Sequence, residues 1–349
     1  MNTRFYFGTC QVGAEKAAKA EVLKEFPYLR FAFSRPGFIT YKEEPADHPV
    51  IESVSSVFTR LWGNVLGQAK GVDGLQDLVD EIPVQAIAHV FDRDLHVPGD
   101  EPPGFVIDAR MQTIVDSLKN PRKKEIKWNA LPKNGDTVFD LIGVDDEHFF
   151  FGEHTHRDSL DPHPGNRPAI ELPTESPSRA YLKIEEAIAR FKPVVNPGMS
   201  VLEVGCSPGG ATLAMLSRKL EVTGVDPKEM APILNGKSGF KFIQKLAKSV
   251  NREDLKAVNP DWLVMDMNIA PVEALEELAH VVSVLKKHYG QELKLKQGFL
   301  TLKLNDWKLA EQIPQYLHRL DAIGFKGLAA TQLCTNRQEF FVYASNFKA

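Results

Sequence analysis

The chain has 349 residues, a formal net charge of -4 and an ordinary globular composition, with 43% hydrophobic and 25% charged residues, and this length favours two or three domains. No apolar run approaches the roughly 18 residues of a membrane helix, and the N-terminus lacks the residue order of a signal peptide, so we expect a cytoplasmic protein with no membrane partner. The three cysteines are widely spaced, which argues against a disulfide framework and a cysteine-based zinc site; they are Cys10, Cys206 and Cys334.

The first half of the sequence mixes strands and helices in an α+β pattern. Short apolar runs bounded by turn residues predict strands at residues 3–10, 37–43, 104–110 and 137–144. Helical spacing of apolar residues predicts a helix over residues 14–26. Prolines between residues 96 and 104 predict a loop, namely Pro98, Pro102 and Pro103.

A proline-rich connector follows at residues 161–177. Its prolines exclude a continuous helix and favour extended chain; they are Pro162, Pro164, Pro168, Pro173 and Pro177. We therefore predict that two separate units flank this segment.

After the connector, strands and helices alternate along the chain. Strands are predicted at residues 199–205, 221–226, 241–243, 261–267 and 298–304. Helices are predicted between them at residues 209–220, 271–288 and 309–324. This alternation predicts a doubly wound α/β sheet with right-handed crossovers, which binds ligands beyond the carboxyl ends of its strands. The last two strands, at 327–333 and 339–345, are separated by a short loop and are expected to be antiparallel.

The segment "VLEVGCSPGGATL" places Gly205, Gly209 and Gly210 between a predicted strand and a predicted helix. Their spacing, G-x-x-x-G-G, differs from the G-x-G-x-x-G pattern that lets the backbone approach a pyrophosphate, so a nicotinamide dehydrogenase is the weaker hypothesis. Asp226 ends the next strand, where a carboxylate can accept both hydroxyls of a ribose. These features favour S-adenosylmethionine as the ligand. The alternative is a tight turn whose glycines serve only packing.

Four charged residues of this half occupy unusual positions. Asp266 ends the apolar strand "DWLVMDM", and Lys303 lies inside the apolar run "GFLTLKL". Lys183 lies on the helix that follows the connector, and Glu339 opens the last strand. Each has an ordinary alternative: a helix cap for Asp266, a snorkelling stem for Lys303, and a solvated charge for the other two.

In this order and context, these four residues resemble the K-D-K-E tetrad of FtsJ-like ribose 2′-O-methyltransferases. The stretches "SPSRAYLKIEEA", "VDPKEMA", "LVMDM", "LKL" and "RQEFFVY" are similar to one branch, the ribosomal RNA large subunit methyltransferase M family. The resemblance is dense in the second half and looser in the first. There, "GTCQVGAEKAAKAEVLKE" and "VFDRDLHVPGD" look like the ferredoxin-like and THUMP portions of that family.

The resemblance implies a Rossmann-like class I methyltransferase domain over residues 178–349, preceded by an α+β module. This module would comprise a ferredoxin-like portion at residues 1–50 and a THUMP-like RNA-binding domain at 51–160, followed by the linker at 161–177. The implied activity is S-adenosylmethionine-dependent 2′-O-methylation of large-subunit, 23S-type ribosomal RNA at a cytidine. The alternative is a catalytically silent RNA-binding protein with a methyltransferase fold.

The tetrad suits this reaction because a ribose 2′-hydroxyl must lose its proton as it attacks a methyl sulfonium. An ordinary lysine, with a pKa of about 10.4, is charged at neutral pH and cannot accept that proton, whereas burial and a neighbouring ammonium lower a lysine pKa. We predict Lys303 as the general base and Lys183 as its charged neighbour. Asp266 and Glu339 would hold the two amines in place.

The resemblance also implies a set of cofactor-binding residues, which are Ser178, Gly205, Ser207, Pro208, Gly209, Gly210, Asp226 and Asp266. Three positions depart from the family pattern. Ala211 stands where an aromatic residue often follows the glycines, and Glu203 replaces an aspartate. Leu246 or Ala247 stands where relatives place an acid toward the adenine amine, so adenine recognition would rest on backbone groups or apolar packing.

Two further patterns lie in the first half. Residues 118–128 combine basic side chains with Trp128, which suits either phosphate contacts with base stacking or a solvated loop. His154, His156 and His163 lie close together in the sequence. Without cysteines or regular carboxylate spacing beside them, we predict no metal site. No pattern indicates an oligomeric state.

Overall fold

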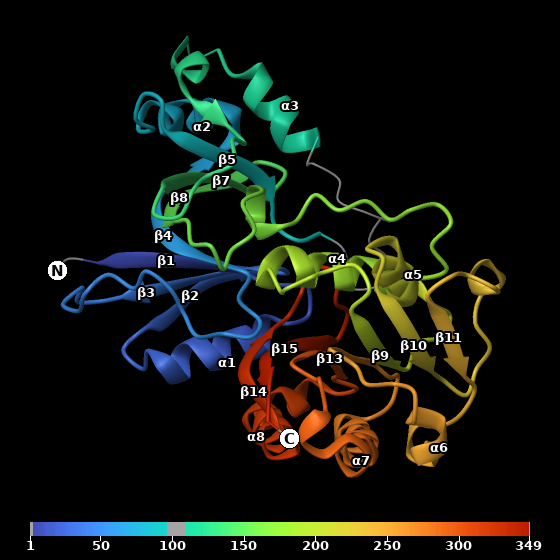
Figure 1. Cartoon of the computed structure of the whole chain (residues 1–349). Helices are drawn as coiled ribbons and strands as arrows, with labels where there is room; N and C mark the ends of the chain where they lie inside the picture. Colours follow the sequence, from blue (N-terminus) through green and yellow to red (C-terminus); the bar gives the residue numbers. More distant parts are fainter. Residues whose placement is uncertain (1–2, 96–108, 120, 349) are drawn as a thin grey trace. The chain divides into compact units, whose positions relative to one another are not determined.

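Residues 3–95, 109–119 and 121–348 are described by the computed structural model (Figure 1). The chain divides between Ala169 and Ile170 into two units, and the division falls inside the proline-rich connector. Among the described residues, no helix is long and apolar enough to cross a membrane.

The first unit is built on one eight-stranded sheet with the order β2-β3-β1-β4-β8-β7-β5-β6. Its strands are β1 (Arg4–Thr9), β2 (Arg30–Arg35), β3 (Phe38–Glu43), β4 (Leu61–Lys70), β5 (Ile87–Asp92), β6 (Lys127–Trp128), β7 (Thr137–Asp145) and β8 (His148–Thr155). Neighbouring strands are antiparallel, except that β5 runs parallel to β6 and to β7. The helices are α1 (Glu15–Glu25), α2 (Gly71–Asp80) and α3 (Ala109–Ser117), with short 3₁₀ turns η1 (Pro121–Glu125) and η2 (Pro164–Asn166).

Long-range pairing makes this unit continuous. The boundary expected at residue 50 separates β1, β2 and β3 from the later strands, and the structure joins the two sets by pairing β1 with β4. The apolar core follows the same course, since Phe7 and Phe38 of the early strands pack with Ile142 and Phe150 of the later ones. Burial of such large apolar side chains is the main favourable term in folding.

Most elements predicted for this unit are present. The helix predicted over 14–26 is α1, and the strands predicted at 3–10, 37–43 and 137–144 are β1, β3 and β7. The loop predicted at 96–104 and the strand predicted at 104–110 lie outside the described residues, except for the last two positions of that strand. The strand prediction is wrong there, because Ala109 and Arg110 begin α3.

The second unit contains a seven-stranded sheet with the order β11-β10-β9-β12-β13-β15-β14. Its strands are β9 (Ser200–Val204), β10 (Glu221–Val225), β11 (Phe240–Ile243), β12 (Trp262–Asp266), β13 (Gln297–Lys303), β14 (Phe325–Thr331) and β15 (Glu339–Phe347). Its helices are α4 (Ala180–Phe191), α5 (Gly210–Ser217), α6 (Arg252–Leu255), α7 (Pro271–Tyr289) and α8 (Ile313–Ile323). Short 3₁₀ turns complete it: η3 (Pro232–Leu234), η4 (Ala247–Ser249), η5 (Gly290–Glu292) and η6 (Trp307–Gln312).

The α/β sheet predicted for this unit is confirmed. Strands β9, β10, β11, β12 and β13 all run parallel to one another. Strand β15 pairs antiparallel with both β13 and β14. Figure 1 shows α4 and α5 on one side of the sheet and α6, α7 and α8 on the other. Covered on both faces, the central strands consist almost entirely of buried residues, as parallel strands do.

One predicted helix is divided in the structure. Residues 309–324 were expected to form a continuous helix, whereas η6 ends at Gln312 and α8 begins at Ile313. Pro314 lies in the first turn of α8, where a missing backbone N–H costs nothing. The same proline inside a longer helix would remove a hydrogen bond and clash with the preceding turn.

Candidate active site

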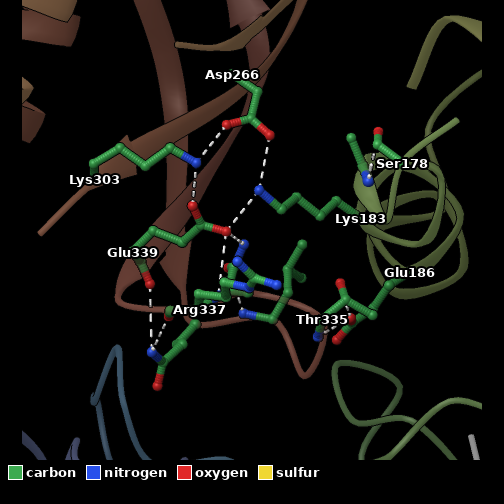
Figure 2. Close-up of polar contacts among 12 residues, drawn as sticks. Ser178, Lys183, Glu186, Asp266, Lys303, Thr335, Arg337 and Glu339 are labelled. Carbon is green, nitrogen blue, oxygen red and sulfur yellow. Dashed lines mark hydrogen bonds and ion pairs between the residues drawn. The ribbon is translucent and has the colours of Figure 1, made fainter. Parts of the chain in front are cut away.

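The four charged residues singled out from the sequence meet in one cluster (Figure 2). Lys183 Nζ lies 2.7 Å from Asp266 Oδ2 and 2.6 Å from Glu339 Oε1. Lys303 Nζ lies 2.7 Å from Asp266 Oδ1 and also contacts Glu339 Oε2. Each lysine therefore contacts both carboxylates. We call this closed arrangement of two cations and two anions the charge ring.

The sheet topology explains why these residues meet. Asp266 and Lys303 are the last residues of the parallel neighbours β12 and β13. Glu339 is the first residue of β15, and because β15 is antiparallel to β13, it pairs directly with Lys303 at the same edge. The fourth residue, Lys183, comes from α4. The Lys183 and Lys303 side chains are only 12% and 16% exposed, so neither is a solvated or snorkelling lysine.

Opposite charges hold three members of the ring in their ionised forms, namely Lys183, Asp266 and Glu339. Burial lowers the pKa of Lys183, but the Asp266 and Glu339 carboxylates outweigh it and raise that pKa above its ordinary value. Burial likewise raises the pKa of Asp266, while Lys183 and Lys303 hold it well below its usual range. The pKa of Glu339 is lowered by the same two lysines against the effect of burial. Lys183 is therefore charged at neutral pH.

A second layer of contacts supports Glu339 and was not anticipated from the sequence. Asn336 is fully buried and donates its amide N–H to Glu339 Oε1 at 3.0 Å. Glu186, one turn after Lys183 on α4, has a buried carboxylate that binds the loop before β15. The only sequence signal for Glu186 was its spacing of three residues from Lys183, which places both on one side of a helix.

The glycine loop between β9 and α5 lies against the end of β12. Gly205 has φ of +82°, and a Cβ there would lie 2.6 Å from the carbonyl oxygen of Asp266. A Cβ on Gly210 would lie 2.5 Å from the carbonyl oxygen of Ser178. Only glycine permits these close backbone approaches. The first places Gly205 beside Asp266 of the charge ring, and the second places Gly210 beside Ser178. Gly209, with φ of +111°, is the N-cap of α5.

Asp226, which follows β10, is bound to the same loop. Its carboxylate accepts the backbone N–H of Ser207 at 3.1 Å and that of Lys228 at 2.8 Å. The Ser207 hydroxyl donates to the carbonyl of Glu229 at 2.8 Å, and the carbonyl of Pro208 accepts the N–H of Ala231 at 3.0 Å. A carboxylate has about four lone-pair positions, so Asp226 keeps acceptor capacity for the hydroxyls of a ribose.

Glu203 lies inside the unit, two residues before Gly205. Its side chain is buried, and Thr212 donates a hydrogen bond to Oε2 at 2.6 Å. Burial raises the pKa of Glu203 to about 8, against the lowering effect of the Thr212 hydrogen bond. Glu203 is therefore an uncharged acid at neutral pH in the folded protein.

Two other departures from the family pattern have clear places in the structure. Ala211 is buried in the core that α4 and α5 form over the sheet. Leu246, which stands where relatives place an acid, follows β11 and is 45% exposed. Its neighbour Lys245 forms an ion pair with Asp254 at 2.6 Å, and Asp254 also closes the capping box of α6. This acid is therefore engaged elsewhere.

The two sequence patterns of the first unit are resolved differently. Trp128 is half-buried against an apolar core and donates its indole N–H to the carbonyl of Lys123 at 2.8 Å. His154 is buried and lies 2.6 Å from Asp140, whereas His163 lies 2.7 Å from Asp161. Within the described part of the chain, no group of three or more His, Cys, Asp or Glu residues could hold a metal ion.

Residues 177–326 match the family model described as FtsJ-like methyltransferase, which confirms the resemblance inferred from the sequence. Two similar relatives are named ribosomal RNA large subunit methyltransferase M. The protein of Halorhodospira halophila is 30% identical over 188 residues, which cover 52% of this chain and 50% of the relative. That of Laribacter hongkongensis is 31% identical over 188 residues, which cover 50% of this chain and 49% of the relative.

The chain thus spans about half the length of the curated relatives it matches. Among solved structures, TrmN from Thermus thermophilus is similar over 98% of this chain and 99% of its own chain, with 13% sequence identity and a TM-score of 0.35.

The buried Glu203 carboxyl is expected to make stability depend on pH. Because its pKa is raised to about 8 in the folded state, the folded chain holds one proton more than the unfolded chain from about pH 4.3 to about pH 8. Stability should therefore fall as pH rises through this window, by at most about 1.4 kcal/mol per pH unit. Glu203→Gln should lose this slope in urea unfolding measured across the window. If the free energy of unfolding has the same pH dependence in the wild type and in Glu203→Gln, Glu203 does not have the raised pKa.

Proposed function

We propose that the second unit transfers a methyl group from S-adenosylmethionine to a ribose 2′-hydroxyl of large-subunit ribosomal RNA, at a cytidine. The observation that carries this proposal is the charge ring, which places two lysines and two carboxylates beside a glycine loop at the carboxyl edge of the sheet. In open α/β sheets, ligands bind at this edge. The names of the similar relatives support ribosomal RNA as the substrate.

The proposed base is Lys303. The new O–CH₃ bond forms as the S–CH₃ bond breaks, and the hydroxyl proton passes to the Lys303 amine, which must be neutral beforehand. Lys183, whose pKa is raised by Asp266 and Glu339, keeps its proton and is assigned as the charged neighbour of Lys303. Asp266 and Glu339 hold both amines at fixed positions, which lowers the entropic cost of the reaction.

The residues beside the ring fit S-adenosylmethionine, which would supply an electrophilic methyl group when bound. The glycines Gly205, Gly209 and Gly210 let the loop backbone pack closely at the edge of the sheet where the cofactor would bind. Asp226 would accept the ribose hydroxyls, and Leu246 would pack on the adenine. Four further positions would complete the site: Ser178, Ser207, Pro208 and Asp266.

We assign RNA recognition to the first unit. It would comprise a ferredoxin-like portion at residues 1–50 and a THUMP-like portion at 51–160. The linker at 161–177 would connect it to the enzyme domain at 178–349. Three lysines of the segment 118–128 support phosphate contacts, since they are exposed and cations dominate RNA backbone binding; they are Lys119, Lys124 and Lys127. A ribosomal RNA substrate accords with the expected cytoplasmic location. A silent RNA-binding protein is the second candidate, which the missing acid at Leu246 favours.

Replacement of the proposed base should abolish turnover while leaving binding intact. With tritiated S-adenosylmethionine and unmodified ribosomal RNA, Lys303→Ala should lower the single-turnover rate at least about 100-fold, because a general base contributes on the order of 10² or more. Lys296→Ala, which removes an exposed lysine just before the same strand, is the matched control and should keep the wild-type rate.

Product nucleosides resolved by mass decide between the outcomes of this assay. Label should appear in 2′-O-methylcytidine. Label on a base would contradict the assignment of the charge ring, and a wild-type protein that binds RNA without transferring label would support the silent RNA-binding protein.

Loss of the carboxylate at the end of β10 should weaken cofactor binding. Asp226→Asn should raise the Kd for S-adenosylmethionine about tenfold or more in calorimetric titration, since a hydrogen bond to a charged group contributes roughly 1.5 kcal/mol or more. Glu221→Gln alters an exposed acid at the opposite end of the same strand and should leave the Kd unchanged. Equal Kd values for the Asp226 variant and the wild type, or preferential binding of a nicotinamide dinucleotide, would overturn the cofactor assignment.

A further inference from the structure

We propose that Glu186 is a positioning residue of the charge ring, which fastens the loop before β15 to helix α4 and thereby sets the separation of Lys183 and Glu339. The catalytic consequence of this inference rests on the proposed function. The mechanical part concerns only the chain itself and can be tested without cofactor or RNA.

The carboxylate of Glu186 is buried and uses both oxygens. Oε1 accepts the backbone N–H of Cys334 at 2.7 Å, and Oε2 accepts the backbone N–H of Thr335 at 2.9 Å and its hydroxyl at 2.7 Å. Figure 2 shows Glu186 against this loop, below the charge ring in the view. A buried carboxylate is costly unless hydrogen bonds compensate it, and these three donors provide that compensation.

The same loop carries the groups that hold Glu339. Asn336 donates its side-chain N–H to Glu339 Oε1 at 3.0 Å and accepts the N–H of Leu333 at 2.8 Å. The backbone N–H of Arg337 reaches the same Glu339 oxygen at 3.3 Å. The contacts of Glu186 and those of Glu339 therefore belong to consecutive residues of one short turn, so a shift of Thr335 would move the donors of Glu339.

Two polar contacts of different kinds link helix α4 to this loop. One is the ion pair of Lys183 with Glu339 at 2.6 Å, and the other is the Glu186 carboxylate on the loop backbone. A lysine side chain has several rotatable bonds and fixes little by itself. Hydrogen bonds from a carboxylate to two successive backbone N–H groups are short and directional. Glu186 thus supplies the rigid connection, and Lys183 follows one turn away on the same helix.

A replacement at Glu186 should disturb the ring selectively. In Glu186→Gln, the amide NH₂ would face a loop donor, so one side of the connection is lost while the volume is kept. The matched control is Glu185→Gln. This substitution removes the neighbouring carboxylate, which accepts a hydrogen bond from Arg218 Nε at 2.9 Å. Among the described residues, Glu185 pairs with Arg218 and with no member of the ring, so the control measures the general effect of losing an acid from α4.

The first readout needs neither cofactor nor substrate. Nitrogen NMR of lysine side chains in the full chain should show a slowly exchanging Lys183 ammonium signal, assigned by its loss in Lys183→Arg. Exchange of its hydrogens with water should become about tenfold faster or more in Glu186→Gln, because the ring opens more often, and should not change in Glu185→Gln. Equal exchange rates in the wild type and both variants would overturn the proposal.

The second readout is methyl transfer. Glu186→Gln should lower kcat about 10- to 100-fold, as small misplacements of catalytic groups do, with KM for RNA unchanged, and Glu185→Gln should keep both constants. A wild type without methyl transfer would refute the proposed function, while the exchange result would still decide the role of Glu186. If Glu186→Gln does not fold, two variants of Thr335 replace it. Thr335→Val removes the hydroxyl that binds Glu186 and should speed hydrogen exchange of the Lys183 ammonium, whereas Thr335→Ser keeps the hydroxyl and should not. Identical behaviour of these two would overturn the proposal.

Discussion

The direct pairing of Lys303 with Glu339 across β13 and β15 is the constraint on which the candidate site depends. Parallel strands deliver their last residues to one edge of a sheet, so Asp266 and Lys303 meet there without special provision. A glutamate reaches the same edge because β15 runs antiparallel and begins where β13 ends. The helix that follows the connector then needs to contribute only Lys183 to close the charge ring.

The electrostatics of the ring suggest function more than stability. Two cations and two anions give it no net charge, and each amine contacts both carboxylates. Taking four charges largely out of water is expensive, and apolar side chains of similar volume often stabilise a core as well or better. Such an arrangement is more readily explained by chemistry that requires an amine in a fixed place. Clusters of shifted pKa values at the ligand-binding edge of a sheet fit this explanation.

Local patterns in the sequence were sufficient for much of the second unit. Alternating apolar strands and helices predicted the parallel sheet, and charges interrupting apolar runs pointed to Asp266, Lys303 and Glu339. Long-range contacts were not predictable in this way. The pairing of β1 with β4 joins segments on either side of residue 50, and no local composition encodes it. Glu186 binds a loop about 150 residues away in the sequence, so its role depends on the folded topology. Pro314 indicates that a new helix begins near residue 313, but the apolar periodicity of residues 309–324 predicts one continuous helix.

We propose that the Lys303 amine of the charge ring accepts the hydroxyl proton. The most direct test is the pH dependence of the single-turnover methyl-transfer rate at saturating cofactor and RNA. A lysine base predicts a rate that rises about tenfold per pH unit on the acidic side of the profile and then levels off, because only the neutral amine can accept a proton. A wild-type rate that does not vary with pH over the range in which the protein stays folded would contradict a lysine base.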